Sequence, residues 1–134
     1  MGYDIHITRK DEWSEDGNDI PLNTWINYCS IDGEMTIVNT AEVDLENKEK
    51  LSYSNNGLAI WNKYSKNTDQ NKAWFDYQSG NIVVKNPDQE IIDKMIRISK
   101  ALGAKVQGDD GECYGDPTNN KFTIIKNKPW WKIW

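Results

Sequence analysis

The sequence predicts an α+β fold, a mainly antiparallel sheet with two helices packed on one face. Residues 3–9 alternate apolar and polar side chains, which is typical of a strand with one buried face. Residues 86–103 instead carry apolar side chains at spacings of three and four, which is typical of an amphipathic helix. A second such helix and several short strand-like segments complete the pattern. The 134 residues are the size of one domain, so we expect a single domain over residues 1–134.

The first expected strand has two faces. Its core-facing residues are Tyr3, Ile5 and Ile7. Those expected on the opposite side are Asp4, His6 and Thr8.

The first helix is expected at 22–31, after an acidic loop over 11–19. One stripe of this helix carries Leu22, Trp25, Ile26 and Cys29. Pro21 suits the first turn, where an N–H is not needed, and the Asp32–Gly33 pair marks the stop. A short strand is expected at 35–38.

The middle of the chain is ambiguous, since 41–50 fits either a strand or a frayed helix. The Asn56–Gly57 pair predicts a turn. A strand follows at 58–64, with Leu58 and Ile60 on one face, and then a polar loop reaches residue 72. Segments 74–77 and 81–85 are expected to pair as a hairpin.

The second helix has the clearest boundaries. Asn86 can cap it, Pro87 suits the first helical position, and Asp88 complements the positive end of the helix dipole. Gly103 can end it. The expected remainder is a strand at 104–107, a turn at 108–111 and a final strand at 122–125.

Composition limits the function classes. The net charge of −5 argues against general affinity for nucleic acid. No apolar run approaches the length of a membrane span, and the first residues lack the pattern of a signal peptide. The two cysteines, Cys29 and Cys113, are too few for a disulfide framework. We therefore expect a cytoplasmic protein that binds neither nucleic acid nor membranes.

His6 is the chain's only histidine and has two interpretations. Asp4, on the same strand face, could orient it as a general base, and Cys29 or Cys113 could supply a nucleophile. Against catalysis, Cys29 belongs to the apolar stripe, and a lone histidine is more often structural or solvated. One imidazole with two thiols does not make a zinc site, so we expect no metal, no cofactor and no catalytic residue.

Segment 107–116 concentrates carboxylates and glycines. Its acids, which could surround Ca²⁺ or Mg²⁺, are Asp109, Asp110, Glu112 and Asp116. Their spacing does not match an EF-hand loop, and a turn between strands explains the same composition. The segment is therefore interpreted as a loop without a metal.

Every charged residue from 11 to 34 is acidic. A solvated face and a patch that steers toward a basic partner explain this run equally well. Trp13 lies inside the run and could act as an aromatic anchor for such a partner.

The tail at 126–134 contains three tryptophans and three lysines. It could pack on the core, dock a partner, lie in a membrane interface, or stack on single-stranded bases. The acidic remainder of the chain favours the first two.

Several sequence segments resemble those of a family of small bacterial cytoplasmic proteins. They are YDIHITR at residues 3–9, residues 22–28, KNPD at 85–88 and above all GAKVQGDDGE at 103–112. Proteins of this kind look like immunity proteins of polymorphic-toxin systems. The resemblance implies binding and neutralisation of a cognate toxin, and it carries over no catalytic residue.

We therefore expect a non-enzymatic immunity-type protein that occludes the active site of a cognate protein toxin, such as a basic nuclease. The candidate partner-binding residues are Asp11, Glu12, Trp13, Glu15, Asp16, Asp109, Asp110 and Glu112. The alternative is a small enzyme or ligand-binding domain that uses His6, Asp4 and the 107–116 loop.

Overall fold

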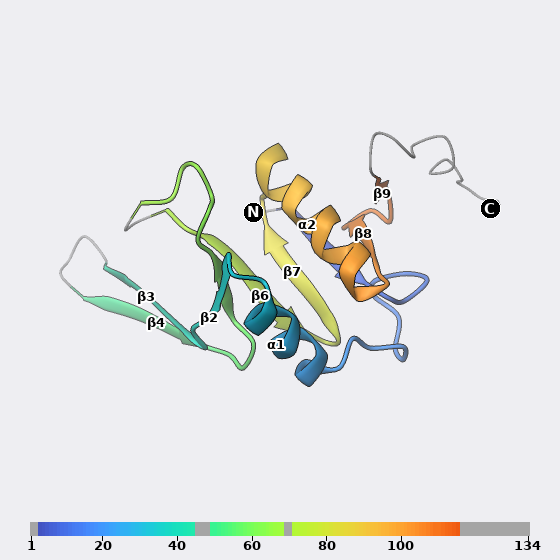
Figure 1. Ribbon diagram of the computed structural model, residues 1–134, viewed down its shortest axis with the longest axis horizontal. Helices are drawn as coiled ribbons and strands as arrows, with labels where there is room; N and C mark the ends of the chain where they lie inside the picture. The colour runs from blue at the N-terminus through green and yellow to red at the C-terminus, as the bar shows by residue number, and fades with distance from the viewer. Residues whose placement is uncertain (1–2, 45–48, 69–70, 116–134) are drawn as a thin grey trace.

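A computed structural model confirms the predicted α+β fold (Figure 1). It describes residues 3–44, 49–68 and 71–115. The strands are β1 (Asp4–Thr8), β2 (Met35–Ile37), β3 (Thr40–Asp44), β4 (Lys50–Ser54), β5 (Ala59–Trp61), β6 (Ala73–Gln78), β7 (Asn81–Lys85), β8 (Lys105–Gly108) and β9 (Cys113–Tyr114). The helices are α1 (Leu22–Ile31) and α2 (Gln89–Leu102). The expected strand at 122–125 and the tail at 126–134 lie outside the described residues.

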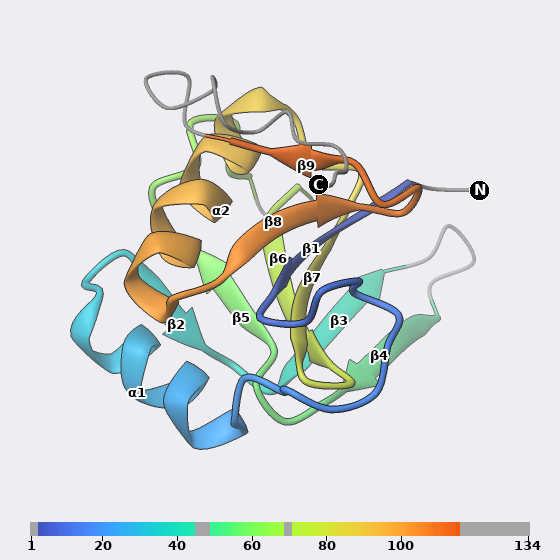
Figure 2. The ribbon, with the colours of Figure 1, turned by 90° about the vertical axis from the view of Figure 1, so that its right-hand side faces the viewer.

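The larger sheet has seven strands in the order β2-β5-β6-β7-β1-β8-β9, and β3 and β4 form a separate hairpin. Every strand pair in the described residues is antiparallel. Both helices pack on the same side of the sheet, as Figure 2 shows. The other side of the sheet carries the loop that follows β1.

The core lies between the two helices and the face of the sheet on which they pack. Ile7 of β1 lies opposite Ile82 of β7 and Val106 of β8, so neighbouring strands bring apolar side chains to one face. Trp25 of α1 and Met95 of α2 are fully buried in the same cluster. Burial of these apolar surfaces supplies the main stabilisation.

The first helix begins and ends as predicted, and the ambiguous segment 41–50 contributes to strands β3 and β4. The hairpin of β6 and β7 is also confirmed. Its turn is Ser79–Gly80, and both residues have positive φ angles, 53° and 81°. Turns of that hand match the twist of the flanking strands.

Several details of the prediction are wrong, among them the place of Pro87, which precedes the helix cap, and the strand expected at 58–64, which spans only Ala59–Trp61. The N-cap of α2 is Asp88, whose carboxylate accepts the Ile91 N–H, whereas the Asn86 side chain accepts the backbone N–H of Tyr3. In β5 the buried residues are Ala59 and Trp61, and Ile60, which the pattern placed on one face with Leu58, is only half-buried. Burial of Trp61 removes a large apolar side chain from water.

Strand β6 changes partner halfway along its length. Residues 73–75 pair with β5, and residues 76–78 pair with β7. A cavity of about 510 Å³ is lined by residues of β4, β6 and β7, among them Tyr53, Trp74 and Lys85.

Candidate functional site

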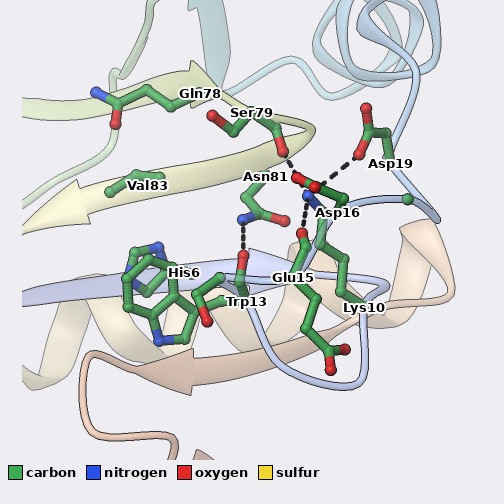
Figure 3. A pocket seen from close by; sticks show the side chains of 12 residues that line it. His6, Lys10, Trp13, Glu15, Asp16, Asp19, Gln78, Ser79, Asn81 and Val83 are labelled. Carbon is green, nitrogen blue, oxygen red and sulfur yellow. Dashed lines mark hydrogen bonds and ion pairs between the residues drawn. The ribbon is translucent and has the colours of Figure 1, made fainter.

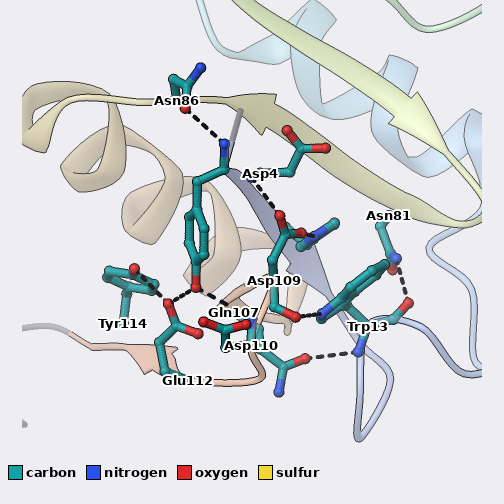
Figure 4. A network of polar contacts seen from close by, with 11 residues as sticks. Asp4, Trp13, Asn81, Asn86, Gln107, Asp109, Asp110, Glu112 and Tyr114 are labelled. Atoms are coloured by element: carbon teal, nitrogen blue, oxygen red, sulfur yellow. Dashed lines mark hydrogen bonds and ion pairs between the residues drawn. The ribbon is translucent and has the colours of Figure 1, made fainter. Parts of the chain in front are cut away.

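Two acidic segments, the loop at 9–19 and the turn at 108–112, meet on the sheet face opposite the helices (Figure 4). The 9–19 loop follows β1, and the 108–112 turn joins β8 to β9. They are far apart in sequence, yet the indole N–H of Trp13 donates directly to the Asp109 carbonyl, and Gln107 of β8 bonds to both segments. The structure therefore brings the predicted contact residues into one surface.

Gln107 of β8 is the main link between the segments. Its side chain is 1% exposed, and its Oε1 accepts the backbone N–H of Trp13 at 2.8 Å. Its Nε2 donates to the carbonyl of Gly111 at 3.0 Å and to Glu12 Oε2 at 3.4 Å. One buried amide thus fixes both the loop and the turn.

His6 lies on the predicted face of β1, but it is only 4% exposed because Trp13 covers it. The two rings are stacked, with centroids 4.0 Å apart and planes 6° apart. His6 Nε2 lies 2.9 Å from Asp109 Oδ1, and the indole N–H of Trp13 donates to the Asp109 carbonyl. Three residues from three segments are therefore packed together.

The Asp109 carboxylate is held as an anion. Burial alone would raise the pKa of Asp109, but hydrogen bonds from the Asp4 backbone N–H and the His6 ring outweigh it and lower that pKa. Since an ionised carboxylate only accepts hydrogen bonds, His6 Nε2 carries the hydrogen in this pair.

Glu112 is held by two tyrosines. The hydroxyls of Tyr3 and Tyr114 donate to its Oε2. Burial alone would raise the pKa of Glu112. The hydrogen bonds lower it by more than burial raises it, so the pKa of Glu112 lies below its ordinary value. The turn after β8 is therefore anchored at Glu112 as well as at Asp109.

The predicted contact residues differ in exposure. The exposed side chains are Asp11, Glu12, Glu15, Asp16, Asp110 and Glu112. Asp109 and Trp13 are half-buried. One ring face of Trp13 covers His6, so less of this residue is available to a partner than an exposed anchor would offer.

The alternative catalytic grouping is brought together only in part. His6 and the 107–116 loop are in contact, but Asp109, rather than Asp4, is the carboxylate bonded to the ring. Cys29 lies in the core on the helix side of the sheet, and burial, with Asp32 nearby, raises the pKa of its thiol to about 12. It is therefore not a nucleophile for His6.

A cavity of about 440 Å³ lies beneath the 9–19 loop (Figure 3). It is lined by His6 and Trp13, together with three residues that the sequence did not indicate as site residues: Lys10, Asn81 and Val83. The polar residue Asn81 directly follows the turn glycine of a hairpin, which is the signal that could have indicated it.

A second polar cluster lies under the end of α1. The buried ammonium of Lys94 donates to Asp32 at 2.7 Å and to Glu34 at 3.1 Å. Burial raises the pKa of Asp32, but the bonds from Lys94 and Tyr28 lower it below its ordinary value. For Glu34, hydrogen bonds from Trp61 and Lys94 lower the pKa.

Within residues 3–44, 49–68 and 71–115, no group of three His, Cys, Asp or Glu side chains is placed to hold a metal ion. No helix in the described part of the chain is both long and apolar enough to cross a membrane. Comparisons with protein-family models, with curated proteins and with solved structures found no match. The fold and site define an α+β protein with an acidic surface on the open face of its sheet.

Proposed function

We propose that this is an immunity-type protein that binds a cognate toxin and neutralises it by covering the toxin's active site. The observation that carries the proposal is the joining of the two acidic segments by Gln107 and Trp13. A location in the cytoplasm, where such a toxin would act, belongs to the same proposal.

The surface has the charge to attract a basic partner. Segments 11–19 and 109–112 contain eight carboxylates and no basic residue. The neighbouring lysines, Lys10 and Lys105, direct their ammonium groups to main-chain carbonyls at the base of the loop. A toxin that cleaves nucleic acid needs a basic surface to hold phosphates, and a negative surface can occupy the same place.

The surface is also ordered before a partner arrives. Lys105 Nζ donates to the Asp11 carbonyl, and Gln107 holds the backbone of Trp13 and Gly111. Binding to a preformed surface avoids the loss of conformational entropy that ordering two loops would require. Fast, steered association is therefore available without induced folding.

A matched pair of charge reversals tests the proposal. One variant combines Asp16→Lys with Asp110→Lys, one position in each acidic segment. The control combines Glu42→Lys on β3 with Asp93→Lys on α2, so both variants change the net charge equally. Asp16 and Asp110 are exposed, and no hydrogen bond or ion pair of their side chains occurs within the described part of the chain. Both variants are therefore expected to fold.

The partner for this test is the product of the adjacent gene. We expect the site variant to associate about tenfold more slowly at low salt and to lose growth rescue, while the control keeps both. The difference should shrink as added salt shortens the Debye length from ~10 Å toward ~3 Å. Equal association rates for the two variants would contradict the proposal.

A further inference from the structure

The cavity beneath the 9–19 loop has a buried floor and an exposed rim. The floor residues, all less than a tenth exposed, are His6, Lys10, Asn81 and Val83. The rim is formed by exposed residues, among them Ser14, Asp16 and Asp19. Figure 3 shows these side chains converging from the loop and from β1 and β7. The cavity is thus open to a partner at its rim.

The floor contains an acceptor with no donor. Asn81 is 2% exposed, and its Nδ2 donates to the Trp13 carbonyl at 2.9 Å. This bond fixes the orientation of the amide, and Oδ1 has no hydrogen-bond partner within the described residues. A buried acceptor in a native protein is normally satisfied, so one left over indicates a missing donor.

His6 supplies a second acceptor of the same kind. Its Nε2–H is directed to the Asp109 carboxylate, so in the imidazole form of the ring the lone pair lies on Nδ1. Nδ1 is buried, and no partner for it exists in the part of the chain that the structure describes. The stacked indole of Trp13 prevents the ring from turning toward solvent.

Lys10 cannot satisfy either acceptor. Its ammonium has three hydrogens, and three acceptors already take them: the carbonyls of Glu15 and Ser79 at 2.8 Å and Asp19 Oδ1 at 3.2 Å. Its charge is paired with Asp19, while Glu15 and Asp16 add further negative charge at the rim. The cavity therefore offers acceptors and a net negative field.

We infer that this cavity receives a guanidinium group, the side chain of an arginine on the protein partner. Guanidinium is planar, carries five N–H donors, is weakly hydrated and stacks on aromatic rings, so it suits two fixed acceptors beside Trp13. The inference rests on the proposed function, because it names the group by which a basic partner would engage the acidic surface.

The probe for the test is methylguanidinium, with methylammonium and urea as comparisons. Because the chain has a single histidine, both imidazole ¹⁵N resonances belong to His6, and their couplings to the ring protons distinguish Nδ1 from Nε2. We expect methylguanidinium to shift the Nδ1 resonance in a saturable way, with a dissociation constant of about 1–10 mM. Urea, which has similar donors without charge, should bind about tenfold more weakly.

Two substitutions at the rim locate the binding. Asp16→Asn removes one charge at an exposed position and should weaken methylguanidinium binding about fivefold. The matched control is Glu42→Gln on β3, away from the cavity, and it should leave binding unchanged. Ser14→Trp fills the opening of the cavity without changing the charge of the surface. It should abolish the change that methylguanidinium causes in the His6 ¹⁵N resonance.

Several outcomes overturn the inference and leave the proposed function standing. One is the absence of a saturable His6 shift with methylguanidinium, and another is equal binding of urea. A third is unchanged affinity for the partner in Ser14→Trp, which would show that the partner places no arginine in the cavity. Failure of the charge-reversal test with intact methylguanidinium binding would instead remove the proposed function, and with it the arginine of a toxin as the occupant, while the guanidinium site in the cavity would stand.

Discussion

Replacing Gln107 by leucine should detach the 9–19 loop and the 108–112 turn from β8. Leucine has a similar size, so the side chain still fills the buried position, but it has no amide. The backbone N–H of Trp13 and the carbonyl of Gly111 then lose their partners. The substitution therefore isolates the hydrogen bonds from the packing.

The two losses differ in size. A buried group left without a partner costs about 1–3 kcal/mol. The Trp13 N–H faces the buried Gln107 side chain, whereas Gly111 is half-exposed and its carbonyl can reach water. We expect the free energy of unfolding to fall by about 2–3 kcal/mol, a large part of the 5–15 kcal/mol typical of a domain.

Urea unfolding followed by far-UV circular dichroism measures the change, which should lower the midpoint by about 1–2 M. The matched control is Gln78→Leu, since Gln78 is exposed at the end of β6 and its side-chain amide donates to the Asp76 carboxylate at the surface. It should change stability by less than ~0.5 kcal/mol. An equally small change in Gln107→Leu would refute the assignment of Gln107 as the link.

Two further predictions concern the helix side of the sheet. Lys94→Met should destabilise the protein by about 2 kcal/mol at pH 7, because it leaves the partly buried Asp32 without its cation. Since the folded state lowers the pKa of Asp32 and Glu34, their stabilisation is present above the ordinary carboxyl pKa and is lost as the pH falls through the lowered values. Below about pH 4 the difference between wild type and Lys94→Met in thermal unfolding should therefore narrow, and a constant difference would contradict this origin. In labelling with iodoacetamide, exposed Cys113 should react in the native protein and Cys29 only after denaturation, as mass spectrometry can show; equal rates would contradict the burial and raised pKa of Cys29.

Elements with local signals were predictable from the sequence. The second helix has its apolar spacing and its terminal Gly103 within one continuous segment, and the Ser79–Gly80 turn identifies the hairpin. The sequence predicts the N-cap of α2 two residues too early because Asn86 and Asp88 both have side chains that can cap a helix. The choice depends on Tyr3, 83 residues away, whose N–H occupies the Asn86 side chain.

The site was predictable as a set of acidic residues but not as an assembled surface. Its assembly depends on contacts between distant segments, such as those of Gln107 and the stacking of Trp13 on His6. A polar residue at an alternating position of a strand reads as solvent-facing, and only the covering loop makes Gln107 and His6 buried. No periodicity in the sequence contains that information.

The change of partner along β6 separates two regions that can vary independently. The acidic surface and its cavity rest mainly on β1, β7 and β8, whereas the β3–β4 hairpin continues from the half of the sheet that ends in β2 and β5. Tyr53 and Asn55 bond this part of the chain to two residues of β6, through the carboxylate of Asp76 and the carbonyl of Tyr77. Changes of sequence within strands β3 and β4 should therefore be tolerated during evolution without moving the carboxylates that meet a partner.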